Sequence, residues 1–343
     1  MSFLFPSSTI TFEAAIRDLT SKNPRARAFA AHALGDVDDP TERRRAVEAL
    51  LGALEDDRPE VRAEACSSLG DLGEDTAIAG LIKRLDDGAA PVRQNAAIAL
   101  GTLRAAAGFE PLAEALRSGP ADLRFQAATS LAEIDPRRAF EPLLAALSDK
   151  DGQVASSAAL ALGVIPGRVE DKALETRART ALVEHLEHGD ASTRFDVAYA
   201  LADLGDPAGR VVLSRGLDDE DRAWDAVTAL AKLGTPADLD ELAAALTDRG
   251  VPAEATVLAA GKVLAQRPSE PAKRVLLAGL TARKTHVRGL AVEQLTEVGG
   301  EWALAALEKM ATLGKNEELG EVIATALATI RSRQQSRTGG GSK

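Results

Sequence analysis

Apolar residues recur along the chain at the spacing of an amphipathic helix, and the whole pattern returns after about thirty residues. Val61, Ala65, Leu69 and Leu72 stand at offsets 0, 4, 8 and 11 of one such segment, which places them on one face of a helix. Gly73 follows directly, at the position where glycine commonly ends a helix. The pattern therefore predicts repeated amphipathic helices, each closed by a glycine.

The repeat is clearest when the copies are aligned on the residue that follows Val61. Each copy predicts a short first helix such as residues 140–147, an acidic turn such as residues 55–57, and the second helix described above. A unit of this size cannot bury its own apolar face, so neighbouring units must stack into a solenoid. Nine copies are found, with this anchor position at Arg27, Arg62, Arg93, Arg124, Ala155, Arg194, Ala223, Ala253 and Arg288.

The line Asp-x-x-Pro-x-Val-Arg-x-x-Ala-Ala-x-x-Leu-Gly-x-Leu-Gly, which is most complete from Asp56 to Gly73, resembles the bacterial HEAT-like repeats of the phycobilisome-lyase type. The resemblance runs from about Phe12 to Arg333 and implies an all-α solenoid of about nine helix-turn-helix repeats, with a capping helix near residues 317–333. It also implies that the second helices line a concave surface. We expect residues 1–10 to be a tail, 11–333 a single solenoid with an irregular connection near 164–171, and 334–343 a flexible tail.

Composition narrows the classes of partner. The chain has 52 acidic against 41 basic residues, a net charge of −11, which argues against nucleic acid and against an anionic membrane surface. Aromatic residues make up only 3%, so the core must be built from Ala, Leu and Val. Neither a signal peptide nor a long apolar segment is recognised. These features predict a cytoplasmic protein whose partner is a protein or peptide carrying basic residues.

The residues that could carry chemistry favour structural roles. Each anchor arginine lies one turn from an acidic loop, and we expect it to bind the carbonyls and carboxylates of that loop. Cys66 occupies a small, packed position, which indicates a buried thiol. His185 and His188 stand three residues apart, but a metal site would need ligands from other repeats. Catalytic and nucleotide-binding motifs have no match, nor do paired His-Glu motifs, so we expect no catalytic residues, no metal and no cofactor.

Offsets 1, 2, 5 and 9 from each anchor are the positions left for the concave face. Five of the chain's 11 aromatic residues fall there, together with ten acids and only two bases. An aromatic cluster rimmed by carboxylates resembles a groove for a basic or amphipathic segment of a partner protein. The predicted binding residues are the apolar Phe125, Phe195, Tyr199 and Trp224 and the acidic Glu133, Asp196, Asp203 and Asp225.

Two other interpretations stay open. The aromatic side chains could pack along neighbouring helices while the acids only keep an alanine-rich protein soluble. The repeat resemblance also allows a subunit of a bilin lyase or isomerase, which would act on a chromophore and a phycobiliprotein. A DNA-binding HEAT-like protein would need a basic groove, and this one is expected to be acidic.

Overall fold

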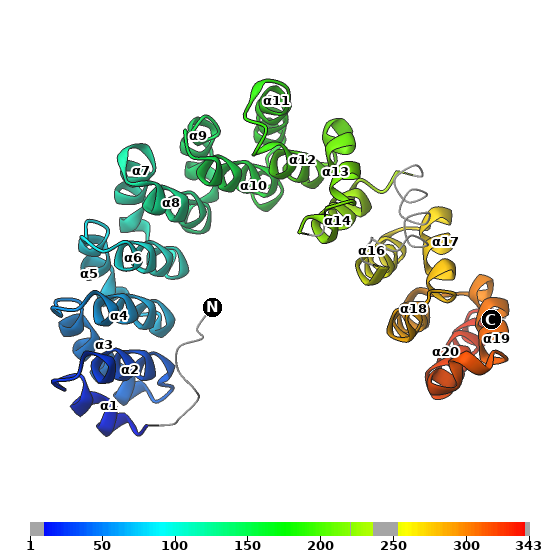
Figure 1. The fold of residues 1–343 in the computed structure, drawn as a ribbon, viewed down its shortest axis with the longest axis horizontal. Coiled ribbons are helices and arrows are strands. Elements are labelled where there is room, and N and C mark those ends of the chain that lie inside the picture. Colours follow the sequence, from blue (N-terminus) through cyan, green and yellow to red (C-terminus); the bar gives the residue numbers. More distant parts are fainter. Residues whose placement is uncertain (1–9, 220, 236–252, 340–343) are drawn as a thin grey trace. The chain divides into compact units, whose positions relative to one another are not determined.

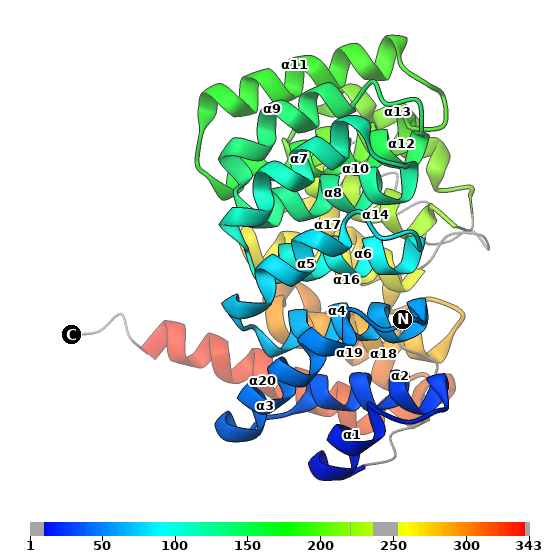
Figure 2. The ribbon, with the colours of Figure 1, turned by 90° about the vertical axis from the view of Figure 1, so that its left-hand side faces the viewer.

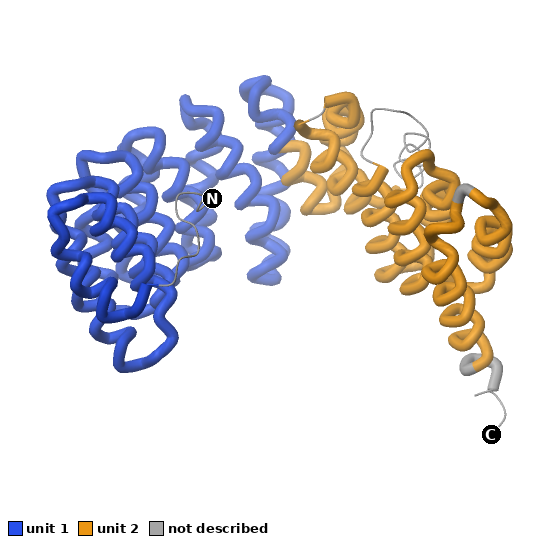
Figure 3. The backbone as a smooth tube through the Cα atoms, turned by 60° about the horizontal axis from the view of Figure 1, so that its bottom comes forward, with its two compact units in different colours: residues 1–196 blue, residues 197–343 orange. Residues whose placement is uncertain are grey.

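The computed structural model describes residues 10–219, 221–235 and 253–339, and every regular element in these ranges is helical. The chain forms two compact units, Met1–Asp196 and Val197–Lys343 (Figure 3). The first helix expected before Ala253 falls on residues 236–252, outside the described residues. The all-α class expected from the repeats is confirmed.

Unit 1 is a stack of helix pairs in which first and second helices form separate layers (Figures 1 and 2). Each second helix from α2 to α10 packs against its own first helix, and these five second helices pack against one another in chain order. The first helices are α1 (Phe12–Asp18), α3 (Pro40–Ala53), α5 (Ile78–Arg84), α7 (Phe109–Ser118), α9 (Pro136–Ala146) and α11 (Lys172–His188). The second helices are α2 (Pro24–Ala33), α4 (Pro59–Leu72), α6 (Ala90–Thr102), α8 (Ala121–Ile134) and α10 (Gly152–Arg168), and α12 (Arg194–Asp203) follows at the unit boundary.

Unit 2 continues with helices of the same kind, and α20 packs on α18 and α19 as a cap. Its helices are α13 (Arg210–Gly216), α14 (Ala223–Leu233), α16 (Ala253–Gln266), α17 (Glu270–Gly279), α18 (Thr285–Val298), α19 (Glu301–Ala311) and α20 (Gly320–Gly339). The cap thus runs past residue 333. In unit 1, residues 164–168, expected in an irregular connection, instead continue α10, and α10 and α11 are both 17 residues long.

Local sequence signals begin and end these helices. Pro40 and Pro59 occupy the first turn, where no backbone N–H is needed. Asp39 caps α3 by accepting hydrogen bonds from the N–H groups of Thr41 and Glu42 at 2.9 and 3.0 Å. The predicted terminal glycine Gly73 has φ of 74°, and Gly205 and Gly234, which follow later second helices, have φ of 69° and 57°. This is the left-handed conformation that glycine adopts without strain.

Small residues let neighbouring second helices approach closely. A Cβ added to Gly70 of α4 would lie 2.9 Å from Cβ and 3.0 Å from Cα of Ala99 in α6. Gly35 and Gly101 lie equally close to Ser68 and Ser130 of the following second helices. The Leu-Gly pair of the repeat line is therefore a packing device, because only glycine leaves room for the next backbone.

Each anchor arginine such as Arg62 binds a carbonyl of its own loop, as the sequence predicted. Its carboxylate partner lies instead in the following repeat, so the arginines tie each repeat to the next. Arg124 of α8 donates two hydrogen bonds to the Asp149 carboxylate, Nε to Oδ2 at 2.8 Å and Nη2 to Oδ1 at 2.7 Å. Its Nη1 donates to the carbonyl of Gly119 at 2.9 Å. The other described members bind in related ways: Arg27 to Asp56, Arg62 to Asp87, Arg93 to Asp122 and Arg288 to Asn316. Arg194 is exposed.

Acid should weaken this column of arginines. Hydrogen bonds from Arg62 hold the pKa of Asp87 below its usual range, so the unfolded chain takes up the proton first. The stabilisation is complete above the unfolded pKa of about 4 and disappears as pH falls through the folded pKa. We expect the urea-unfolding free energy to decline below about pH 4 and to decline less in Arg62→Ala. Equal declines in both proteins would contradict this origin.

Candidate functional site

Neighbouring second helices contact each other through residues that the repeat alignment had assigned to the exposed concave face. Asn95 of α6 donates a hydrogen bond from Nδ2 to the carbonyl of Ala63 in α4 at 2.9 Å. Ser156 of α10 donates its hydroxyl proton to Asp196 Oδ2 of α12, with the two oxygens 2.6 Å apart. Offsets 1 and 2 therefore lie beside the adjacent second helix. We call the remaining exposed side of α2, α4, α6, α8 and α10 the second-helix face of unit 1.

Phe195 does not belong to an exposed site. Only 5% of its surface is exposed, so the surrounding residues cover almost the whole side chain. The expectation that Phe195 is an accessible anchor is wrong. Phe125, at the same offset in α8, is half-buried and keeps part of its ring accessible.

The predicted acids of unit 1 already have internal partners. Arg168 at the end of α10 donates to both carboxylate oxygens of Glu133, at 2.8 and 3.2 Å. These hydrogen bonds lower the pKa of Glu133. Asp196 accepts from Ser156 as described above. Both acids therefore have stabilising contacts inside the unit.

In unit 2, Tyr199 and Asp203 of α12 form one cluster with Lys232 of α14. Lys232 Nζ donates to the Tyr199 hydroxyl at 3.2 Å, pairs with the Asp203 carboxylate, and lies 4.5 Å from the centre of the Tyr199 ring. Burial by itself would lower the pKa of Lys232, but the hydrogen bonds to Asp203 and Tyr199 outweigh it and raise that pKa. The cluster holds a lysine of this chain, where the prediction placed a partner's cation.

Trp224 and Asp225 stand in the first turn of α14, and both are exposed. The indole-bearing side chain of Trp224 is 47% exposed. A large aromatic surface left in water at this level is a common feature of binding hot spots. These two residues are accessible, as expected.

Sequence reasoning gave no weight to three aliphatic residues on the second-helix face of unit 1. Ile98 of α6 is 45% exposed, and Leu160 and Val164 of α10 are 37% and 41% exposed. They occupy offsets 5, 5 and 9, where the corresponding residues of α2 and α4 are His, Ser and Asp. The signal that could have found them is their position, because the repeat alignment places all three at offsets assigned to the concave face. Phe125, at offset 1 of α8, adds a half-buried ring at the margin of this face, on the helix that packs between α6 and α10.

The same face becomes acidic towards the chain's beginning. Asp36 and Asp71 are exposed near the ends of the first two second helices. Burial and the neighbouring Asp36 charge raise the pKa of Asp71. A cation that approached these two carboxylates would relieve their mutual repulsion.

The remaining candidates for chemistry have structural surroundings. His185 Nε2 lies 3.0 Å from the Thr193 hydroxyl, and burial lowers the pKa of His185. His188 is exposed. Burial raises the pKa of the Cys66 thiol to about 12, which keeps it protonated. Within the described ranges, no three His, Cys, Asp or Glu side chains are grouped so that they could hold a metal ion.

Among the described residues, no helix combines the length and the apolar character needed to cross a bilayer.

The structural comparisons concern the fold. Kap95 in the Kap95:Nup1 complex has a TM-score of 0.58 at 13% identity, over 94% of this chain and 52% of Kap95. The Escherichia coli protein YibA has a TM-score of 0.50 at 20% identity, over 76% and 93% of the two chains. The CpcE–CpcF complex of phycocyanin lyase from Nostoc sp. PCC7120 gives 0.41 at 24% identity, over 80% and 97%.

Sequence comparison finds no significant match among curated proteins. The family profile of HEAT repeats matches residues 13–101 and 109–181. That of the PBS lyase HEAT-like repeat matches residues 92–118. The repeated helix pairs, the arginine column and these matches agree, and the chain contains HEAT repeats, one of them of the PBS lyase HEAT-like type.

Proposed function

We propose that the chain is a non-enzymatic scaffold that holds an amphipathic, basic segment of a partner protein on the second-helix face of unit 1. The observation that supports this best is the exposure of Ile98 on α6 and of Leu160 and Val164 on α10, with the half-buried Phe125 on the intervening helix α8. Large aliphatic side chains cost free energy in water, and their concentration on one face marks an interaction surface.

Charge supports a basic partner. Asp36 and Asp71 lie on the same face, and the chain's net charge is −11. Acids at the margin of an apolar surface attract Lys and Arg and speed the first encounter. The partner segment we propose therefore has apolar residues at helical or extended spacing and basic residues beside them.

Unit 2 contributes a separate contact, in which Trp224 is the anchor and Asp225 the neighbouring charge. Tyr199 and Asp203 of α12 stabilise helix α14, which carries Trp224, because both bind the ammonium group of Lys232 on that helix. Kap95, which this chain resembles in fold, is seen in complex with Nup1, a use of such a fold that is compatible with the proposal.

The test compares matched pairs of exposed aliphatic residues. The partner is first recovered by affinity capture with the full chain. We expect the double variant Ile98→Ser/Leu160→Ser to bind this partner at least about tenfold more weakly than the wild type does. Val211 and Val322 are 58% and 37% exposed on other helices, so Val211→Ser/Val322→Ser serves as the control and should bind as wild type does. Calorimetric titration measures both. Equal affinity of all three proteins would remove the second-helix face of unit 1 from the site.

Two further measurements examine the unit 2 contact and the charge. Trp224→Ala should cost about 2 kcal/mol of partner affinity or more. The association rate should fall as salt rises, because added ions screen the acids. A salt-independent rate would assign the acids to solubility alone.

The bilin-lyase alternative rests on the repeat type alone. Its test is co-expression with a bilin source and a phycobiliprotein subunit. A coloured product that requires this chain would favour the alternative, and a colourless one would favour the scaffold.

A further inference from the structure

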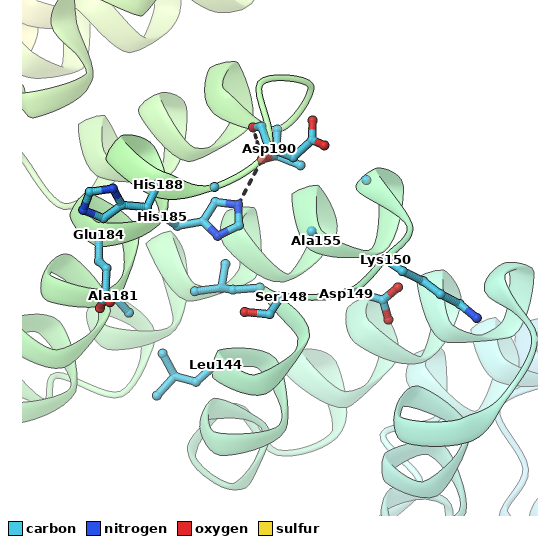
Figure 4. Close-up of a pocket in the computed structure, with 14 residues that line it drawn as sticks. Leu144, Ser148, Asp149, Lys150, Ala155, Ala181, Glu184, His185, His188 and Asp190 are labelled. Carbon is cyan, nitrogen blue, oxygen red and sulfur yellow. Dashed lines mark hydrogen bonds between the residues drawn. The ribbon is translucent and has the colours of Figure 1, made fainter.

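A hollow of about 500 Å³ opens in unit 1 between the α9–α10 turn and the end of α11. Asp149 and Ala155 line one side, and His185 and Asp190 line the other (Figure 4), with Gly152 and Thr193 also in the lining. It lies at the turns between helices, apart from the second-helix face. The hollow coincides with a break in the arginine column, since Ala155 stands at an anchor position.

Asp190 is built like the aspartates that receive an anchor arginine. Asp56, Asp87 and Asp149 each accept a hydrogen bond from the N–H two residues later, at 2.9, 3.0 and 2.8 Å. Asp190 does the same with the N–H of Ser192 at 2.7 Å. The first three carboxylates also bind the guanidinium of Arg27, Arg62 and Arg124. Asp190 therefore keeps the turn of a receiving aspartate opposite an anchor position that holds alanine.

The residue that corresponds to the carbonyl acceptor of the filled slots also lines the hollow. Arg27, Arg62 and Arg93 each donate Nη1 to the carbonyl of the residue six positions earlier, at 3.0, 2.8 and 2.8 Å. Counting six back from Ala155 gives Asp149, which lines the hollow. The α11–α12 turn lies close by, because a Cβ on Gly152 would meet Ser192 Oγ at 2.9 Å.

Asp190 brings an ionised carboxylate to the hollow, and Arg194 is the cation nearby. Hydrogen bonds from Ser192 lower the pKa of Asp190, and Arg194 adds to this, so the carboxylate is ionised at neutral pH. Burial lowers the pKa of His185, which leaves its ring neutral. Lys150 extends away from the other lining residues (Figure 4), and Glu184 adds a second carboxylate at the edge.

We propose that this hollow binds the guanidinium group of an arginine side chain supplied by another protein, which takes the place of the anchor arginine missing at Ala155. The carboxylate of Asp190 would accept two N–H groups, and the carbonyl of Asp149 a third, as in the filled slots. A planar, five-donor guanidinium matches this arrangement, whereas an ammonium does not. The site is independent of the second-helix face, although one basic partner could use both.

The direct test uses N-acetyl-arginine amide, which has the charge of an arginine within a chain. In the wild type, titration should shift the NMR signals of the His185 ring and saturate. N-acetyl-lysine amide should bind at least tenfold more weakly. Asp190→Asn should weaken arginine binding at least tenfold, and Ala155→Arg should abolish it and raise the melting temperature, because its own side chain fills the slot.

Several results would overturn the proposal. The first is that N-acetyl-arginine amide causes no NMR shifts in the wild type, and the second is that Asp190→Asn binds it as tightly as the wild type does. The third is that free L-arginine binds but the capped amide does not, which would indicate a small-molecule site. If Ala155→Arg misfolds, Asp190→Asn still decides. None of these measurements uses a partner protein, so they can fail or succeed separately from the scaffold function.

A second experiment creates an empty arginine slot at another repeat boundary. Arg62→Ala removes the guanidinium that binds Asp87, and ethylguanidinium at millimolar concentration should restore part of the lost melting temperature. Ethylammonium at the same concentration is the control and should restore none. Equal effects of the two cations would show that these slots do not recognise guanidinium.

Discussion

Replacing Arg124 by alanine is expected to lower the free energy of unfolding by about 3 kcal/mol, the scale for breaking a buried ion pair. The side chains of Arg124 and Asp149 are only 7% and 12% exposed. Removing the guanidinium takes three hydrogen bonds from the repeat boundary and leaves the Asp149 carboxylate covered without its cation. Urea titration followed by circular dichroism measures the loss.

Arg117→Ala is the matched control for this prediction. Arg117 pairs with Glu114 on the surface of α7, where the two side chains are 69% and 58% exposed. Such a pair contributes less than about 1 kcal/mol. If both substitutions cost the same, the anchor arginines would be ordinary surface charges and the column would not join the repeats.

Placing valine at Gly70 is expected to cost about 3 kcal/mol, at the upper end for overpacking a well-filled interior. The new Cβ would meet both Cβ and Cα of Ala99 at 3.0 Å or less, and a backbone atom cannot rotate away. Helices α4 and α6 would have to separate along their length, and the contacts of both with their first helices would loosen. Thermal and urea unfolding should both show the loss.

Gly52→Ala controls for the general effect of removing a helical glycine. Gly52 is exposed on α3, and a Cβ added there would have no neighbouring atom within 4 Å. Alanine there should stabilise the protein by up to about 1 kcal/mol, because it lowers the entropy of the unfolded chain and favours the helix. A loss at Gly52, or no loss at Gly70, would refute the close approach of the second helices.

The fold was accessible from the sequence because it depends on a pattern within each repeat. The stripe from Val61 to Leu72 predicted α4, and the glycine after it has the expected left-handed conformation. The carbonyl partner of the anchor arginines was also predictable, but their carboxylate partner in the following repeat was not. An arginine one turn from an acidic loop has few other ways to satisfy its five donors.

The candidate site was harder to predict because exposure depends on a neighbour that a single helix does not reveal. Phe195 and Trp224 share offset 1, yet one is 5% and the other 47% exposed. The difference arises from the side chains of the adjacent helices and from how closely small residues let those helices approach. The same contacts pair Glu133 with Arg168 and Asp203 with Lys232, so a count of acids overstates the charge open to a partner.

The pairing of an arginine in one repeat with an aspartate in the next bears on how such a chain can change its length. Arg62, Arg93 and Arg124 are separated by 31 residues each. A gene rearrangement that deletes residues 62–92 brings Arg93 to the place of Arg62, and Arg93 still has Asp122 ahead of it. Gain or loss of a whole repeat therefore leaves each of these anchor arginines with an aspartate in the following repeat. Loss of part of a repeat would leave an arginine or an aspartate without its partner. Because of these arginine–aspartate pairs, the chain can lengthen or shorten by whole repeats without losing an ion pair between repeats.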